Sequence, residues 1–174
     1  KAVLAAAQAD ILARTLPAYR DAAARGQVEL STSPYFHPIL PLLVNTDSAR
    51  VAVGDARLPP SRFAHPEDAA TQVRMAVQAH ESVFGAPPRG MWCSEQAVGE
   101  DVIPLLAEAG LQWTISDEIV LARSRSGTVT TQPTLDDPLA AYFPYLLERE
   151  GRRLAIVFRD HTLSDLIGFA YQSW

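Results

Sequence analysis

The chain has little cysteine, no long apolar run and no cluster of basic residues. A single cysteine, Cys93, among 174 residues excludes an internal disulfide and a zinc site built from several thiolates. No run reaches the roughly 18 apolar residues of a membrane span, and Asp10 and Arg14 interrupt the apolar N-terminal segment, so no complete signal peptide is expected either. The formal net charge of −5 with dispersed basic residues argues against nucleic acid as a partner. We expect a soluble protein with a free thiol, in a reducing compartment such as the cytoplasm.

What is present is enough apolar sequence for a core. The chain is 48% hydrophobic and 20% charged, a composition typical of globular rather than disordered proteins. We find no internal repeat and no low-complexity linker. Residues 1–174 are therefore expected to form a single domain.

Helical and extended patterns alternate along the chain. Apolar residues at helical spacing predict helices over residues 2–24, 66–84 and 96–108, and short apolar runs predict strands over residues 27–31, 91–92, 111–116 and 154–158. Loops are expected over residues 34–41, 47–60 and 121–139, which are rich in proline or in polar turn residues. The alternation is typical of parallel βα units, whose right-handed crossovers bring the carboxyl ends of the strands to one rim.

Four acidic residues, Glu29, Glu95, Asp117 and Asp160, fall at or near these predicted strand ends. Glu95 is the most informative, because it follows the apolar Met91-Trp92 pair and precedes the predicted helix 96–108. Ligands bind at this rim in α/β folds, and a helix N-terminus keeps a nearby carboxylate ionised. Glu95 is thus a candidate catalytic carboxylate; a residue that only complements the helix dipole is the alternative.

Four segments together resemble the successive signatures of glycoside hydrolase family 57, in its amylopullulanase and α-amylase-like branch. They are GQVELSTSPYFHPILPLL (26–43), GMWCSEQAV (90–98), AGLQWTISDE (109–118) and FRDHTLSDLIGF (158–169). The resemblance covers nearly the whole chain, and the segments occur in the family's order. It implies part of a (β/α)7 barrel that cleaves or transfers α-glucosidic bonds in α-glucans or maltooligosaccharides, with retention of configuration and without a cofactor.

By this resemblance Glu95 is the nucleophile. A retaining mechanism also needs a protonated carboxyl group about 5 to 5.5 Å away. The family places that acid/base aspartate in a later Asp-Gly-Glu segment, which does not occur here, and the family's opening His-Gln-Pro strand does not occur either. The chain is therefore expected to be an internal portion of a larger catalytic domain, and it could lack activity by itself.

Further site residues are expected around Glu95. His37, in a proline-rich loop, can donate hydrogen bonds to sugar hydroxyls, and the resemblance places it at the cleaved sugar. Glu29 could hold His37 or a hydroxyl, or equally could pair with an arginine. Asp160 and His161 could grip glucose hydroxyls or brace the nucleophile with Arg159. A structural ion pair between Arg159 and Asp160 or Asp165 is the alternative.

Three more residues complete the predicted site. Asp117, at the end of the strand 111–116, could bind substrate or serve the fold alone. Trp92 and Tyr35 could stack against glucose rings, whereas Trp113, in the middle of a strand, is expected to be packing.

Two other classes of function stay open. A zinc-dependent carbohydrate deacetylase or mannosidase-like enzyme would need converging His and Asp ligands, and the four histidines are scattered without a His-x-x-x-His pair. A non-catalytic glucan-binding homologue would keep the groove without the acid/base residue. An incomplete barrel also leaves an open sheet edge, through which two copies could pair.

Overall fold

The computed structural model describes residues 1–127 and 135–171. Its centre is a four-stranded sheet in the order β1-β2-β4-β3, in which β1, β2 and β4 are parallel and β3 is antiparallel to β4. The strands are β1 (Gly90–Trp92), β2 (Trp113–Asp117), β3 (Tyr145–Arg149) and β4 (Arg152–Arg159). The expected α/β class with a mainly parallel sheet is confirmed.

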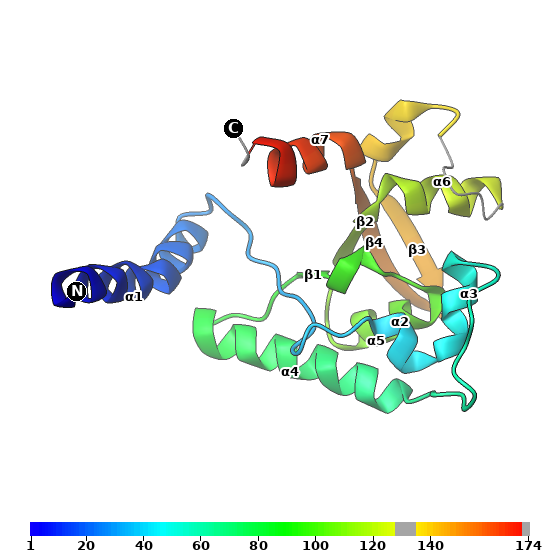
Figure 1. Ribbon diagram of the computed structural model, residues 1–174, viewed down its shortest axis with the longest axis horizontal. Helices are drawn as coiled ribbons and strands as arrows, with labels where there is room; N and C mark the ends of the chain where they lie inside the picture. The colour runs from blue at the N-terminus through cyan, green and yellow to red at the C-terminus, as the bar shows by residue number, and fades with distance from the viewer. Residues whose placement is uncertain (128–134, 172–174) are drawn as a thin grey trace.

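Helices cover one side of the sheet and the end at which β2 and β4 finish (Figure 1). The α-helices are α1 (Ala2–Ala24), α2 (Leu40–Val44), α3 (Ala49–Ala52), α4 (Pro66–Phe84), α5 (Ile103–Glu108), α6 (Glu118–Ser126) and α7 (His161–Asp165). Short 3-10 segments occupy Thr46–Ser48, Ser94–Gln96, Glu100–Val102 and Pro138–Tyr142, and a π turn follows α7 at Leu166–Ala170. None of the helices within the described residues combines the length and the apolar character needed to cross a membrane.

The helix α4 has the sequence signals of both its ends. Pro66 occupies the first turn with Glu67 and Asp68, where a fixed φ and negative charge suit the helix N-terminus. Gly85 ends the helix in the left-handed conformation, at φ 82°. The helix buries a stripe made by Ala69, Val73, Ala76 and His80, which packs with residues of α2, α5 and the sheet into one core of Leu40, Met91, Val102, Leu106 and Leu154.

The two faces of the sheet differ in burial. Thr114 of β2 and its neighbour Ile156 of β4 are buried on the face that the helices cover. The opposite face presents Trp92, Ile115 and Val157, which are adjacent in register across β1, β2 and β4. These three side chains are partly exposed, so the sheet has one covered and one open apolar face.

The helix α1 is present as predicted, with Gly26 in the left-handed conformation just beyond its end. None of its residues is buried, and the helix projects away from the rest of the molecule (Figure 1). A hydrogen bond from Arg20 Nη2 to the carbonyl oxygen of Val83, at 2.5 Å, connects it to α4.

The predicted strand 27–31 is wrong as a regular strand. Pairing is confined to an isolated parallel bridge between Thr32 and Met91, in which Thr32 N donates to Gly90 O and Trp92 N donates to Thr32 O. This segment pairs with β1 alone, and Pro34, which lacks an N–H group, follows the bridge.

The predicted continuous helix 96–108 is also wrong, because α5 begins only at Ile103. Gln96 has a φ of 57° and Gly99 is extended, so neither continues a right-handed helix. The loop expected over 121–139 is wrong in part: α6 extends to Ser126, and a 3-10 turn begins at Pro138. Residues 128–134 of that loop lie outside the described part of the chain.

The predicted strand 154–158 is confirmed and lengthened to β4, and its hairpin partner β3 was not predicted. The two strands are joined by Glu150 and Gly151, both with positive φ, the conformation of a two-residue hairpin turn. The hairpin forms one edge of the sheet.

Candidate functional site

Glu95 lies just past the end of β1, as predicted, in a 3-10 turn rather than in a helix. Glu95 and Gln96 have φ values of 54° and 57°, and such left-handed residues cost roughly 1–3 kcal/mol each unless glycine occupies the position. The turn buries Cys93 and Ser94 completely and leaves the Glu95 side chain 73% exposed. Because α5 begins eight residues later, at Ile103, the expected support from an adjacent helix dipole is absent.

His37 and Trp92 meet at this carboxylate. His37 Nε2 lies 3.4 Å from Glu95 Oε1, and the His37 ring packs 5.4 Å from the Trp92 ring, tilted by 32°. His37 also has a left-handed backbone, at φ 58°, and its N–H donates to Pro34 O. Since both side chains are more than half exposed, the pair itself adds little stability. It instead presents a carboxylate, an imidazole and an aromatic ring together to solvent.

A second polar cluster joins the ends of β2 and β4. Asp117 Oδ2 accepts hydrogen bonds from Arg159 Nε at 2.7 Å and from His161 Nδ1 at 2.9 Å, and Asp165 lies 3.3 Å from His161 Nε2 and 3.4 Å from Arg159 Nη1. Asp117 is nearly buried, with 13% of its side chain exposed. This cluster carries the structural ion pairs that were the alternative interpretation of these residues.

Contacts within the cluster shift the pKa values of Asp117 and His161 in directions that favour their charged forms. Burial alone would raise the pKa of Asp117, but hydrogen bonds from His161, from Ile119 N and from Arg159 outweigh burial and lower it. The hydrogen bond to Asp117 raises the pKa of His161. The histidine is therefore stabilised as a cation between two carboxylates.

Asp160 directly precedes α7 and caps the first turn of this helix. Its Oδ1 accepts from Leu163 N at 2.7 Å and its Oδ2 from the Tyr142 hydroxyl at 2.6 Å. The backbone bond from Leu163 and the hydroxyl of Tyr142 lower the pKa of Asp160, and the same contact raises the pKa of Tyr142. Asp160 is thus an ionised helix cap.

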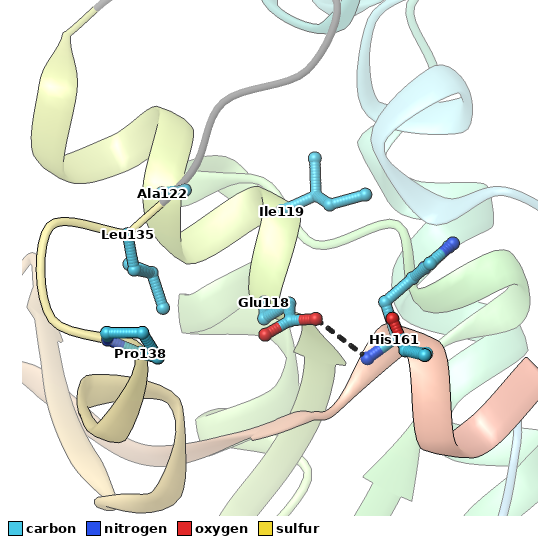
Figure 2. Close-up of a pocket in the computed structure, with 7 residues that line it drawn as sticks. Glu118, Ile119, Ala122, Leu135, Pro138 and His161 are labelled. Atoms are coloured by element: carbon cyan, nitrogen blue, oxygen red, sulfur yellow. Dashed lines mark hydrogen bonds between the residues drawn. The ribbon is translucent and has the colours of Figure 1, made fainter.

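A small cavity of about 260 Å³ opens beside this cluster (Figure 2). Glu118 lies at its wall, and its Oε1 accepts a hydrogen bond from His161 N at 2.9 Å. Residues of α6, of the segment that starts at residue 135 and of α7 complete the lining: Ile119, Ala122, Leu135, Pro138 and Thr162. Sequence reasoning missed Glu118, although its place directly after Asp117 at a strand end was a usable signal.

Two predicted residues lie away from Glu95. Glu29 accepts hydrogen bonds from Trp113 Nε1 at 2.6 Å and from Arg89 Nη1 at 3.3 Å, at the amino ends of β1 and β2; this is the arginine pairing that the sequence left open. Trp113 packs over Gly90, where a Cβ would come within 2.0 Å of the ring. Tyr35 stacks edge-on against Phe36 at 4.7 Å.

The remaining chemistry of the site is limited. Cys93 is free and buried, and burial raises the pKa of its thiol to about 11. In the part of the chain that the structure describes, no group of three or more His, Cys, Asp or Glu residues is arranged to hold a metal ion.

Comparison with known proteins identifies the family. The sequence profile of glycosyl hydrolase family 57 matches residues 1–174. Alpha-amylase 1 from Dictyoglomus thermophilum is 24% identical over 148 residues, which are 85% of this chain and 17% of that protein. The chain thus spans less than a fifth of the length of this relative.

Solved structures show the same fold. A 4-alpha-glucanotransferase from Thermococcus litoralis matches with a TM-score of 0.60 and 21% identity, over 88% of this chain and 19% of that one. A GH57-type branching enzyme from Pyrococcus horikoshii matches with a TM-score of 0.60 and 19% identity, over 97% of this chain and 29% of that one. These neighbours are (β/α)7 barrels, of which the chain matches a segment. On its full-length match to the family profile, the chain belongs to glycosyl hydrolase family 57.

Proposed function

We propose that this chain forms the nucleophile-bearing part of a retaining enzyme that cleaves or transfers α-glucosidic bonds in α-glucans or maltooligosaccharides. The observation that carries the proposal is the meeting of Glu95, His37 and Trp92 at the end of β1. Family membership supports a glycoside hydrolase or transferase, and the relatives named above are an amylase, a glucanotransferase and a branching enzyme.

Glu95 is suited to the first step. An exposed carboxylate attacks the anomeric carbon and forms a glycosyl ester, while the bond from that carbon to the departing sugar oxygen breaks and the oxygen takes a proton. Water, or the hydroxyl of an acceptor sugar, then attacks the ester and releases Glu95. His37 donates a hydrogen bond to a substrate hydroxyl, and Trp92 gives the bound ring an apolar border.

The departing oxygen needs a proton donor, and neither Asp117 nor Asp160 fits that role. A general acid works best with a raised pKa, whereas both of these carboxyl groups have lowered pKa values. We therefore assign the acid/base to a part of the enzyme outside residues 1–174. This assignment treats the chain as an internal portion of a catalytic barrel that needs the rest for turnover.

The other predicted residues take supporting roles in this proposal. Asp117 and His161 hold the ends of β2 and β4 together. Asp160 has an indirect role, in which its carboxylate orients the Tyr142 hydroxyl by accepting a hydrogen bond from it. Tyr35 contributes a stacking surface on the loop that carries His37. Glu29 has a structural role at the opposite end of the strands, where it accepts a hydrogen bond from Trp113.

A non-catalytic glucan-binding protein is the second candidate, favoured by the ionised state of Asp117 and Asp160. It would bind glucan through the same residues without forming a covalent intermediate. The zinc-dependent alternative is not carried forward, since His37 contacts Glu95 and His161 is held between Asp117 and Asp165.

Covalent trapping tests the proposal. A ring-fluorinated α-glucosyl fluoride forms a long-lived glucosyl ester, and its fluoride leaves without needing an acid. We expect peptide mass mapping to find the glucosyl adduct on the peptide that contains Glu95, and to find none in the Glu95→Gln variant. Labelling that persists in Glu95→Gln contradicts the assignment, and glucan binding by the enzyme without any adduct supports the binding protein instead.

A further inference from the structure

The turn that carries Glu95 has an unfavourable backbone. Two consecutive residues other than glycine, Glu95 and Gln96, lie in the left-handed region. Inside the turn, Gln96 N donates to Cys93 O at 2.8 Å and Ala97 N donates to Ser94 O at 3.1 Å. A contact from outside the turn is needed to keep such a pair in place, because strained residues persist only where their surroundings determine them.

Ser116 makes such a contact. It lies in β2, is fully buried, and its hydroxyl donates a hydrogen bond to Gln96 O at 2.9 Å. The Gln96 Oε1 atom adds no tether of its own, because it is buried without a hydrogen-bond partner among the described residues. The hydroxyl therefore ties the left-handed peptide to a strand that is itself paired on both sides by β1 and β4.

The contact is specific to the end of the strand. Thr114, two residues earlier on the same face of β2, donates from Oγ1 to Met91 O, also at 2.9 Å. Met91 lies inside the β1 ladder, which backbone pairing already fixes. The two buried hydroxyls thus make backbone bonds of equal length, one to regular backbone and the other to the turn beside Glu95. Thr114 Oγ1 also lies 3.7 Å from Cys93 Sγ, but it makes no bond to the left-handed residues themselves.

We propose that Ser116 is a positioning residue of this enzyme, which holds the carbonyl group of Gln96 so that the left-handed turn presents the Glu95 carboxylate at the site. The inference rests on the proposed role of Glu95 as nucleophile. Ser116 touches no substrate in this scheme and acts through the peptide of Gln96.

The test compares Ser116→Ala with Thr114→Val in the full-length enzyme. Each change removes one buried hydroxyl with little change of shape. Two quantities are measured per folded molecule. One is the maximal rate at which the ring-fluorinated α-glucosyl fluoride forms the adduct, and the other is the concentration of this reagent that gives half the maximal rate.

We expect Ser116→Ala to lower the maximal rate about tenfold to a hundredfold, because small displacements of a reacting group have effects of this size. The half-saturating concentration should change less than about twofold, as His37 and Trp92 are untouched.

Thr114→Val should lower stability to a similar degree and leave the maximal rate within about twofold. Equal losses of rate in the two variants, or an unchanged rate in Ser116→Ala, overturn the proposal. Failure of the proposed function is distinguishable, because the unaltered enzyme then forms no adduct on Glu95 at all.

A double-mutant cycle with Gln96→Gly tests the cause. Glycine adopts left-handed φ without steric cost, so the hydroxyl should matter less once position 96 is glycine. We expect the rate lost in Ser116→Ala to recover at least partly in the double variant, relative to Gln96→Gly alone. If Ser116→Ala does not fold, the double variant should fold and label. Additive losses, or a double variant that is unfolded or unreactive, overturn the proposal.

Discussion

The side chain of Asp117 connects several elements at the carboxyl ends of β2 and β4. It begins α6 by accepting from Ile119 N, and it binds Arg159 at the end of β4 and His161 at the start of α7. A single nearly buried carboxylate thus fixes three elements. Its loss would leave Asp165, at the longer distances of 3.3 and 3.4 Å, as the carboxylate shared by His161 and Arg159.

The charge of His161 predicts how stability depends on pH. Its pKa is raised in the folded protein, so its contribution is fully present below the ordinary histidine pKa of about 6.5 and is lost as the pH rises through the higher folded value. Asp117 has a lowered pKa, so its contribution is lost as the pH falls below the ordinary value of about 3.9. The cluster should stabilise most between these limits.

Thermal unfolding across this pH range checks the prediction. We expect the melting temperature to decline above about pH 6.5 in the unaltered protein, and the His161→Gln variant to lose most of that decline. The decline should persist in His65→Gln, which alters an exposed histidine outside the cluster. An identical decline in His161→Gln would show that other groups cause it.

At the residue scale, the sequence predicted the acidic groups that follow β1, β2 and β4, whereas Glu29, expected at the same rim, lies at the amino ends of β1 and β2. The contact between His37 and Glu95 spans 58 positions, and its geometry depends on the left-handed backbone at both residues, which no periodicity shows. Ser116 was missed for a similar reason: a serine in a strand gains meaning only from the carbonyl group it faces.

Among the elements, those with strong local signals were predicted best. The helix α4 has Pro66, two acidic residues and Gly85 at its ends, and residues 154–158 of β4 are a continuous apolar run. The failures concern elements whose form depends on neighbours. Residues 96–102 have helical spacing but follow the left-handed turn at Glu95, and the edge strand β3 depends on the hairpin turn at Glu150 and Gly151.

The packing of β1 against β2 makes a prediction for Gly90. A Cβ at this position would lie 2.0 Å from Trp113 Cε2, so the indole must move and give up its 2.6 Å hydrogen bond to Glu29. We expect Gly90→Ala to lower the free energy of unfolding by about 1–3 kcal/mol, the usual effect of overpacking. Chemical denaturation measures this loss.

Gly54→Ala is the matched control for Gly90→Ala. A Cβ at Gly54 meets no atom within 4 Å, and that glycine does not have positive φ. Its unfolding midpoint should match that of the unaltered protein. Equal midpoints for Gly54→Ala and Gly90→Ala would mean that Trp113 moves aside without cost.

For the whole molecule, the open apolar surfaces predict self-association of the isolated chain. On α1, the apolar residues Val3, Leu4, Ile11, Leu12 and Leu16 are 50–85% exposed, and Trp92, Ile115 and Val157 lie partly exposed on the open sheet face. Contiguous apolar surface and open sheet edges favour association. Light scattering of residues 1–174 should show dimers or larger species at micromolar concentration; a monomer at all concentrations would contradict this.

Replacing Leu12 and Leu16 by Gln separates the two surfaces. If α1 carries the association, the double variant should shift towards monomer. If the mass is unchanged, the sheet face or its edge carries it, which is the pairing proposed from the sequence.

The buried thiol of Cys93 is a natural probe of local opening in this protein. The thiol is buried at the end of β1, two residues before Glu95, and its pKa of about 11 keeps it protonated at neutral pH. An alkylating reagent reacts with the exposed thiolate, so it must wait until this end of the strand opens. The rate of alkylation therefore measures how often the end of β1 next to Glu95 opens, without a dye, a tag or a substitution.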